Sequence, residues 1–325
     1  MSAGSGRLPA FLVSAPPAAA IEIAADRVTG VLLGGQRGAW TIAGHASERL
    51  PEGTVTPALN ALNIHDPTVV AGALRSVLER LGARIRRVAL VVPDTSAKVS
   101  LVRFEKIPAR AQDLDRLIRW QVRKAAPFKP EDAQISWVEA SRLADGGREF
   151  IVTLARRDVV EAYEHAVASA GAQAGIVDLA SFNLINAVLA TGAPAGDWLL
   201  VHVARDYASL AIVRGRDLIF FRTRPNDAEG DLGDVVHQTA MYYEDRLGGG
   251  AFSRVILSGV AAASAAAGEI ARASLEARLG TRVEAFDFRQ TAAMRDRISA
   301  GADLLDALAP ALGVLLRERA AERVA

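Results

Sequence analysis

The order of apolar and polar positions predicts that the chain alternates β-hairpins with amphipathic helices. Within the first hundred residues, strands are predicted at 19–24, 28–34, 39–48 and 88–92. Asp66 and Pro67 form a helix start signal, and apolar positions then recur at helical spacing until Gly82. Three strands, a helix and a further strand make up the first half of an α/β lobe.

The pattern changes between about 100 and 175, where it predicts a compact α+β insertion. Its strands are predicted at 101–104, 135–139 and 150–154, and its helices at 113–125 and 157–170. On the first of these helices, Leu114, Ile118 and Val122 form an apolar stripe. A strand at 176–179 and a helix at 181–189 then lead out of the lobe.

One strand–turn–strand unit occurs twice, with a spacing of 180 residues. The first copy is 21–26 (IEIAAD), the second is 201–206 (VHVARD), and each is followed by a returning apolar strand. After the second copy, elements are predicted at 217–222, 233–247, 254–258, 267–279 and 283–286, with a last helix beginning at Pro310. The duplication predicts two related lobes. We assign a tail to 1–17, the first lobe to 18–99 and 176–196, the insertion to 100–175 and the second lobe to 197–325.

Composition excludes several classes of function. The 38 Lys and Arg residues are balanced by 37 Asp and Glu residues, which removes the basic character expected of a nucleic-acid partner. The chain has no cysteine, so disulfides, thiolate zinc sites and cysteine nucleophiles are excluded. Its five histidines show no metal-binding spacing. No apolar run is long enough to span a membrane, and we expect a soluble cytoplasmic protein.

Five short segments occur in an order that points to a known family. They are 118–122 with 126–130, 156–163, 242–244, 255–259 and 310–313. With these segments the chain resembles the PilM family of actin-like proteins of type IV pilus assembly, and more distantly the FtsA cell-division proteins. The resemblance covers nearly the whole chain. It implies an α/β fold of two duplicated actin-like (ribonuclease H-like) lobes, with a small α+β insertion in the first lobe.

In that family the two hairpin turns hold the phosphates of ATP. An Asp near each turn positions magnesium or water, and a Gly two residues later lets backbone N–H groups approach the phosphates. This chain departs from the pattern at both turns, with Glu22 and Ala24 at the first and His202 and Ala204 at the second. Of the Gly-Gly segment near the adenosine only Gly259 remains. If the replaced glycines have a positive φ, each alanine costs roughly 1 kcal/mol.

Other residues of the same turns leave two interpretations open. Asp26 and Asp206 are either residual magnesium-facing carboxylates or ordinary hairpin turn residues. His202 is either a base or an inward-facing strand residue satisfied by a neighbour. The family also carries a small roof subdomain over the nucleotide, which is replaced here by a predicted loop at about 222–236. We therefore expect a degenerate nucleotide cleft in a pseudo-ATPase, with ATP and magnesium disfavoured as ligands.

The resemblance also implies a partner, a PilN-like membrane protein with one membrane span. Its short apolar N-terminal peptide would dock between the first lobe and the insertion, in a groove lined by parts of 100–140 and the adjoining lobe surface. Trp120, which lies about 130° from the apolar stripe at roughly 100° per residue, is a candidate for this groove, as is Phe128. The other interpretation of Trp120 is packing under the turn at Pro127 and Phe128.

The expected function is a non-catalytic cytoplasmic scaffold that couples motor components to the inner-membrane platform of the pilus. The chain would be held at the inner membrane through protein partners, without inserting into it. One alternative is an actin-fold ATPase or kinase, which predicts magnesium-dependent ATP binding. A second is a platform component of type II secretion, a relative that would carry a membrane-spanning helix for which this sequence has no candidate.

Overall fold

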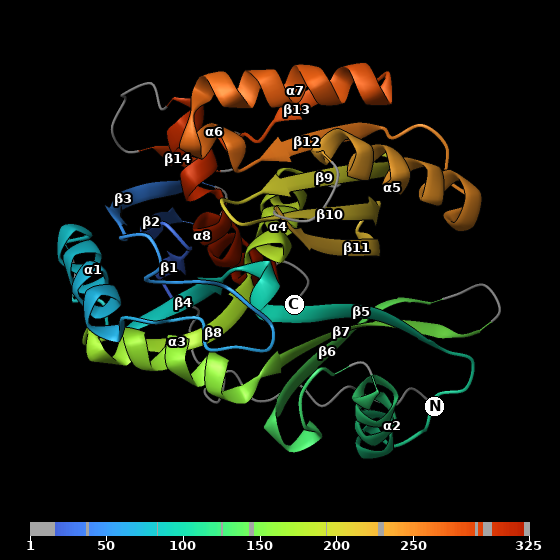
Figure 1. Ribbon diagram of the computed structural model, residues 1–325, viewed down its shortest axis with the longest axis horizontal. Helices are drawn as coiled ribbons and strands as arrows, with labels where there is room; N and C mark the ends of the chain where they lie inside the picture. The colour runs from blue at the N-terminus through green and yellow to red at the C-terminus, as the bar shows by residue number, and fades with distance from the viewer. Residues whose placement is uncertain are drawn as a thin grey trace.

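The computed structural model contains two sheets with flanking helices and a third, smaller sheet (Figure 1). It describes residues 17–36, 39–82, 84–124, 126–142, 146–192, 194–226, 231–289, 292–294 and 301–321. Of the tail expected at 1–17, all but Pro17 lies outside the described residues. Among the described residues, no helix is long and apolar enough to cross a membrane.

The first lobe is built on a sheet of order β14-β3-β2-β1-β4-β8. Its elements are β1 (Ala19–Ile23), β2 (Arg27–Gln36), β3 (Ala39–Arg49), α1 (Pro67–Arg80), β4 (Arg87–Val92), α3 (Arg157–Ser169), β8 (Gln173–Leu179), α4 (Ala180–Thr191) and β14 (Ala292–Met294). The Asp66 carboxylate caps α1 by accepting 3.1 Å hydrogen bonds from the N–H groups of Thr68 and Val69. Val70, Leu74 and Val77 of α1 are fully buried against the sheet.

The second lobe repeats this plan with a sheet of order β11-β10-β9-β12-β13. Its elements are β9 (Asp197–Val203), β10 (Tyr207–Arg214), β11 (Asp217–Pro225), α5 (Leu232–Leu247), β12 (Arg254–Ser258), α6 (Val260–Ala263), α7 (Ala265–Leu279), β13 (Val283–Ala285) and α8 (Ala302–Ala321). The duplication holds in register: Ile23 pairs with Val28 in the first hairpin, and Val203 pairs with Ala208 in the second.

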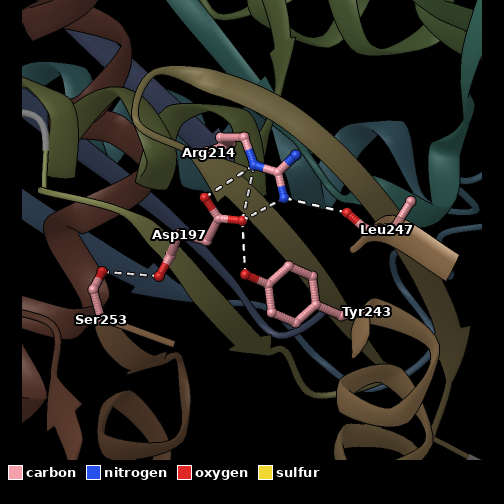
Figure 2. Close-up of polar contacts among 5 residues, drawn as sticks. All are labelled: Asp197, Arg214, Tyr243, Leu247 and Ser253. Atoms are coloured by element: carbon pink, nitrogen blue, oxygen red, sulfur yellow. Dashed lines mark hydrogen bonds and ion pairs between the residues drawn. The ribbon is translucent and has the colours of Figure 1, made fainter. Parts of the chain in front are cut away.

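Figure 2 shows how α5 is attached to the second sheet. The Asp197 carboxylate, at the start of β9, accepts hydrogen bonds from both Nε and Nη2 of Arg214 and a 2.7 Å bond from the Tyr243 hydroxyl. Arg214 Nη2 also donates to the Leu247 carbonyl at the end of α5. The two charge-assisted bonds between Arg214 and Asp197 fix the position of the Asp197 carboxylate. The hydroxyl of buried Tyr243 therefore has a fixed acceptor where α5 crosses the strands.

The insertion is a three-stranded sheet of order β5-β7-β6 with one covering helix. Its elements are η2 (Asp94–Ser96), β5 (Ala97–Phe104), α2 (Ala111–Arg123), η3 (Pro130–Asp132), β6 (Ala133–Arg142) and β7 (Arg148–Arg156). The predicted stripe is confirmed, because Leu114, Ile118 and Val122 of α2 are buried against Phe150 and Val152 of β7.

Three parts of the chain differ from the sequence expectation. Helix α3 falls inside the range 100–175 assigned to the insertion, yet its apolar side packs in the core of the first lobe with α1. Helix α8 begins at Ala302 and contains Pro310, which was expected to start it. The loop expected at 222–236 is shorter, since β11 continues to Pro225 and the Asp231 carboxylate caps α5 through the N–H of Asp234 at 2.7 Å.

Helices α4 and α8 lie side by side between the two large sheets (Figure 1). Leu184 of α4 and Leu312 of α8 are fully buried there, in one cluster with Trp198 of β9. The approach of the helices is close at Gly313, where an added Cβ would lie 1.8 Å from the carbonyl oxygen of Asn183. The core that joins the lobes therefore depends on a residue without a side chain at this crossing.

We predict that Gly313→Ala destabilises the protein by about 2 kcal/mol or more, because the methyl group overlaps α4 backbone that cannot move away. The matched control is Gly72→Ala on α1, where an added Cβ meets nothing within 4 Å. That change should stabilise the protein by roughly 0.5 to 1 kcal/mol. Urea unfolding measures the change in the free energy of unfolding for both variants. Equal changes would contradict the close contact between Gly313 and α4.

Candidate functional site

A cavity of about 360 Å³ lies between the two hairpin turns. All seven residues predicted for the degenerate cleft line it: Glu22, Ala24, Asp26, His202, Ala204, Asp206 and Gly259. The cavity is also lined by seven residues that were not predicted as site residues, which are Ala25, Arg27, Pro93, Val203, Arg205, Tyr207 and Val260. These residues meet because the two turns lie at equivalent ends of equivalent strands.

Each turn is closed by its own backbone. The N–H of Ala24 donates to the Arg27 carbonyl at 2.9 Å, and the N–H of Ala204 donates to the Tyr207 carbonyl at 2.8 Å. No described residue other than glycine has a positive φ. The strain considered for the two alanines therefore does not arise, and their N–H groups are engaged within the hairpins.

Gly259 has a structural reason to be glycine. Its φ is +97°, and an added Cβ would lie 2.0 Å from the carbonyl oxygen of Val203. Its N–H donates to the Asp306 carboxylate at 2.7 Å. With the N–H groups of Ala24 and Ala204 also engaged, one backbone donor on each turn and the N–H at the expected adenosine segment already have partners within the protein.

Glu22 and His202 occupy equivalent positions on β1 and β9, and both side chains are buried. Burial raises the pKa of Glu22 from 4.5 to about 7, against the opposing charge of Arg27. The Oε2 atom of Glu22 is buried without a hydrogen-bond partner among the described residues. Burial lowers the pKa of His202, so the imidazole is neutral near pH 7, and its Nε2 lies 3.5 Å from the Tyr207 hydroxyl.

Asp26 and Asp206 both face the cleft, one on each turn. Burial raises the pKa of Asp206, and the nearby charge of Asp26 adds to the rise. Asp26 lies 3.5 Å from Nη1 of Arg27. The backbone carbonyls of the two aspartates accept equivalent bonds, from Leu50 at 2.8 Å and Asn226 at 2.9 Å. Among the described residues, no three Asp, Glu or His side chains are grouped to hold a metal ion.

Two aspartates behind the cleft were missed by the sequence analysis. Asp94 is completely buried and accepts hydrogen bonds from the N–H of Ser181 at 3.0 Å, from the Ser181 hydroxyl and from the Ser209 hydroxyl at 2.7 Å. Asp306 is buried and accepts from the Ser258 hydroxyl at 2.7 Å. A single acid within the apolar run 304–309 was a sequence signal for Asp306; Asp94 had no such signal.

Trp120 and Phe128 line neither the cleft nor the groove described next. Trp120 lies on α2 with 62% of its surface exposed, so it is not packed under the turn at Pro127 and Phe128. Phe128 is half-buried. The polar partner of α2 is instead Trp137, whose indole N–H donates to the Asp115 carboxylate at 2.9 Å.

A groove of about 300 Å³ separates the insertion from the first lobe. From the insertion it is lined by Ser96, Ala97, Gln134, Ser136, Thr153 and Ala155, and from the lobe by Val92, Val159, Val160, Tyr163, Glu164, Val177, Asp178 and Leu179. The expected range 100–140 therefore supplies only Gln134 and Ser136. The lining contains valines, small polar side chains and two carboxylates, but no Lys or Arg.

A further cavity of about 650 Å³ lies in the second lobe along β12 and β13. Its charged lining is largely paired within the protein. Arg254 Nη2 lies 2.7 Å from the Glu284 carboxylate, and Arg272 Nη2 lies 2.7 Å from the Glu269 carboxylate. These pairs tie β12 to β13 and stiffen α7, which accounts for their charges without a ligand.

Comparison with known proteins identifies the family. The family model described as "Type IV pilus assembly protein PilM" matches residues 20–238, more than half of the chain. Among solved structures, the chain is similar to the "PilM-PilN type IV pilus biogenesis complex" with a TM-score of 0.79 and 17% identity, over 93% of this chain and 98% of that chain. The likeness shows a duplicated actin-like fold. Comparison with curated proteins gave no match.

Two other structures are similar at lower scores. Ethanolamine utilization protein EutJ from Carboxydothermus hydrogenoformans has a TM-score of 0.48 and 12% identity, over 94% of this chain and 90% of that chain. The cytoplasmic domain of EpsL, an inner membrane component of the type II secretion system of Vibrio cholerae, has a TM-score of 0.48 and 8% identity, over 93% and 94%. Both scores are too low to bear on function.

We predict that Glu22→Gln stabilises the protein at pH 8 but not at pH 5. The folded state raises the Glu22 pKa from 4.5 to about 7, so it holds a proton that the unfolded chain releases. The stabilising effect of this proton is complete below pH 4.5 and is lost as the pH rises through 7. The neutral amide avoids that loss, which is on the order of 3 kcal/mol at most. Urea unfolding at both pH values tests this, and a pH-independent difference would contradict it.

Proposed function

Because the chain belongs to the family of the type IV pilus assembly protein PilM, we propose that it is a non-catalytic scaffold that captures the N-terminal segment of a PilN-like membrane protein. The observation that carries the proposal is the groove between the insertion and the first lobe. The similar structure is a complex of PilM with PilN, which supports a partner of this kind. The partner would hold the chain at the cytoplasmic face of the inner membrane, next to other platform and motor proteins.

The chemistry of the groove suits an extended segment with apolar side chains and a positive group. Val160 and Val177 offer apolar surface, while Glu164 supplies negative charge, since the Asp178 carboxylate is already paired with Arg317. Strand β6 is the outer strand of its sheet in the described part of the chain, so an incoming segment has backbone groups to pair with. Alternate side chains of such a segment would enter the groove.

The cleft between the turns supports the non-catalytic part of the proposal. A nucleoside triphosphate needs backbone donors at its phosphates, whereas the N–H groups of Ala24 and Ala204 are bonded within the hairpins. The N–H of Gly259, at the expected adenosine segment, is bonded to Asp306. Glu22 and Asp206 add carboxylates at the same place. We therefore propose that ATP and magnesium are not ligands of this cleft, although the architecture around it is actin-like.

The first test concerns the groove. A synthetic peptide with the N-terminal sequence of the PilN-like protein encoded nearby should bind the purified chain at micromolar concentration in calorimetry. Val160→Arg places a long cation in the apolar part of the groove and should weaken binding by at least tenfold, about 1.4 kcal/mol.

The matched control for Val160→Arg is Glu161→Arg, the next residue of α3, which is exposed and does not line the groove. It should bind the peptide as the unaltered chain does. Absence of binding to the unaltered chain at high micromolar peptide would refute the proposed partner, and equal losses in the two variants would refute the proposed groove.

The second test concerns the cleft. We expect no change in the midpoint of thermal unfolding on addition of Mg-ATP, because ligand binding to the folded state would raise it. Asp206→Ala removes a cleft carboxylate and serves as the control. A rise of several degrees with Mg-ATP that disappears in Asp206→Ala would show a working nucleotide site and overturn this part of the proposal.

A further inference from the structure

The insertion carries a second exposed surface, on the side of its sheet opposite the groove. Side chains alternate along β7, so that Phe150 and Val152 lie under α2 while Thr153 and Ala155 line the groove. The outer side of α2 exposes Trp120 to solvent over 62% of its surface. An indole this exposed is unusual for a residue with no packing role, and its neighbours on the helix are basic.

Charge is distributed unevenly between the insertion and the rest of the chain. Residues 97–156 contain twelve Lys and Arg against eight Asp and Glu, while the remainder contains 26 against 29. The near-neutral total therefore conceals a positive insertion on a slightly negative body. Such an asymmetry orients a protein toward an anionic surface before any contact is made.

The positive charge is concentrated around Trp120. Arg116, Arg123 and Lys124 lie within roughly 60° of Trp120 on the α2 helix, at 100° per residue. Arg123 and Lys124 are exposed and have no ion pair within the described part of the chain. We call Arg116, Trp120, Arg123 and Lys124 the α2 basic surface.

Two acidic side chains near this surface are already engaged. Asp115 accepts a 2.6 Å bond from Nε of Arg119 and a 2.9 Å bond from the Trp137 indole, and these bonds lower its pKa. Asp113 lies 3.7 Å from Nη1 of Arg116, whose side chain is 79% exposed. The surface therefore presents cations and an indole to solvent, with Asp113 on the same side of the helix paired to Arg116, and Asp115 bonded to Arg119 and Trp137.

We propose that the α2 basic surface rests on anionic lipid headgroups of the cytoplasmic leaflet. The inference rests on the proposed function, because capture of a membrane protein's N-terminal segment brings the chain within reach of the bilayer. Trp favours the interface between headgroups and acyl chains, and Lys and Arg favour anionic lipids. Protein hot spots sit in well-packed pockets, whereas Trp120 is 62% exposed and lines neither the cleft nor the groove.

The contact is peripheral and weak by itself. It consists of a few solvent-screened charges and one side chain, so it depends on ionic strength and needs a second attachment for stable residence. The groove supplies that attachment from the other face of the same sheet.

The experiment is co-sedimentation of the full chain with vesicles of phosphatidylcholine alone, or with about a third phosphatidylglycerol, the anionic lipid. At low ionic strength the chain should bind the anionic vesicles at least tenfold better than the neutral ones, and physiological salt should weaken this. Anionic vesicles should also shift the Trp emission to shorter wavelength, and the shift should be absent in Trp120→Phe.

The decisive variant is Arg123→Glu/Lys124→Glu, which should lose at least tenfold in binding to anionic vesicles. The control is Arg75→Glu/Arg246→Glu, an equal change of charge at exposed positions on α1 and α5, which should keep most of the binding. Equal losses in the two pairs would show attraction by net charge alone and overturn the proposal. Absence of binding to anionic vesicles would overturn it too, and would leave an acidic protein as the alternative occupant.

The result of the vesicle-binding test does not depend on the groove. The Arg123→Glu/Lys124→Glu variant should bind the PilN-like peptide as the unaltered chain does, because neither residue lines the groove. Retained peptide binding without vesicle binding would reject the membrane contact alone. Loss of peptide binding in Val160→Arg concerns the groove alone, so the two proposals fail separately.

Discussion

The relation between the two lobes depends on a buried carboxylate. Asp94 lies two residues after the end of β4, a strand of the first lobe. It accepts hydrogen bonds from Ser181 of α4 and from Ser209 of β10 in the second lobe. A fully desolvated carboxylate is costly unless its oxygens are hydrogen-bonded, so these contacts must form together. Asp306 of α8 joins the second lobe to the central helices in the same way, through Ser258 and Gly259. The width of the cleft is thus set by side chains of the protein.

The residues predicted for the cleft line one cavity because the pattern that carries the two turns is local and repeated. The two turns carry the same alternation at a spacing of 180 residues, and equivalent strands put equivalent positions at one opening. The same local pattern gave the buried stripe of α2. The pattern does not indicate which helix or strand each element packs against. Val159 and Val167 predict that α3 is amphipathic, but only the folded chain shows that they face α1. The role of Asp94 is also absent from the local pattern, since the serines that donate to it lie 87 and 115 residues away in the sequence.

Pro310 shows a limit of predicting helix boundaries from the positions of prolines. A proline inside a helix removes one backbone bond and crowds the preceding turn, which favours placing it at a helix start. Here the helix continues through it because the residues on both sides, Leu308 and Leu312, are buried in the core between the lobes. Packing of that core outweighs a local cost of about 3 kcal/mol. Packing can offset this cost only at a position that is enclosed by α4 and both sheets.

Under the proposal that the cleft takes no nucleotide, the insertion is the part of the chain that binds partners. Its sheet has two faces, and β7 contributes to both, with Thr153 at the groove and Val152 beneath α2. A partner segment in the groove and headgroups at the α2 basic surface would therefore be held by one rigid unit. Two weak contacts on a rigid unit reinforce each other, because the first raises the effective concentration for the second. In this arrangement the sheet of the insertion sets the orientation of both lobes relative to the membrane.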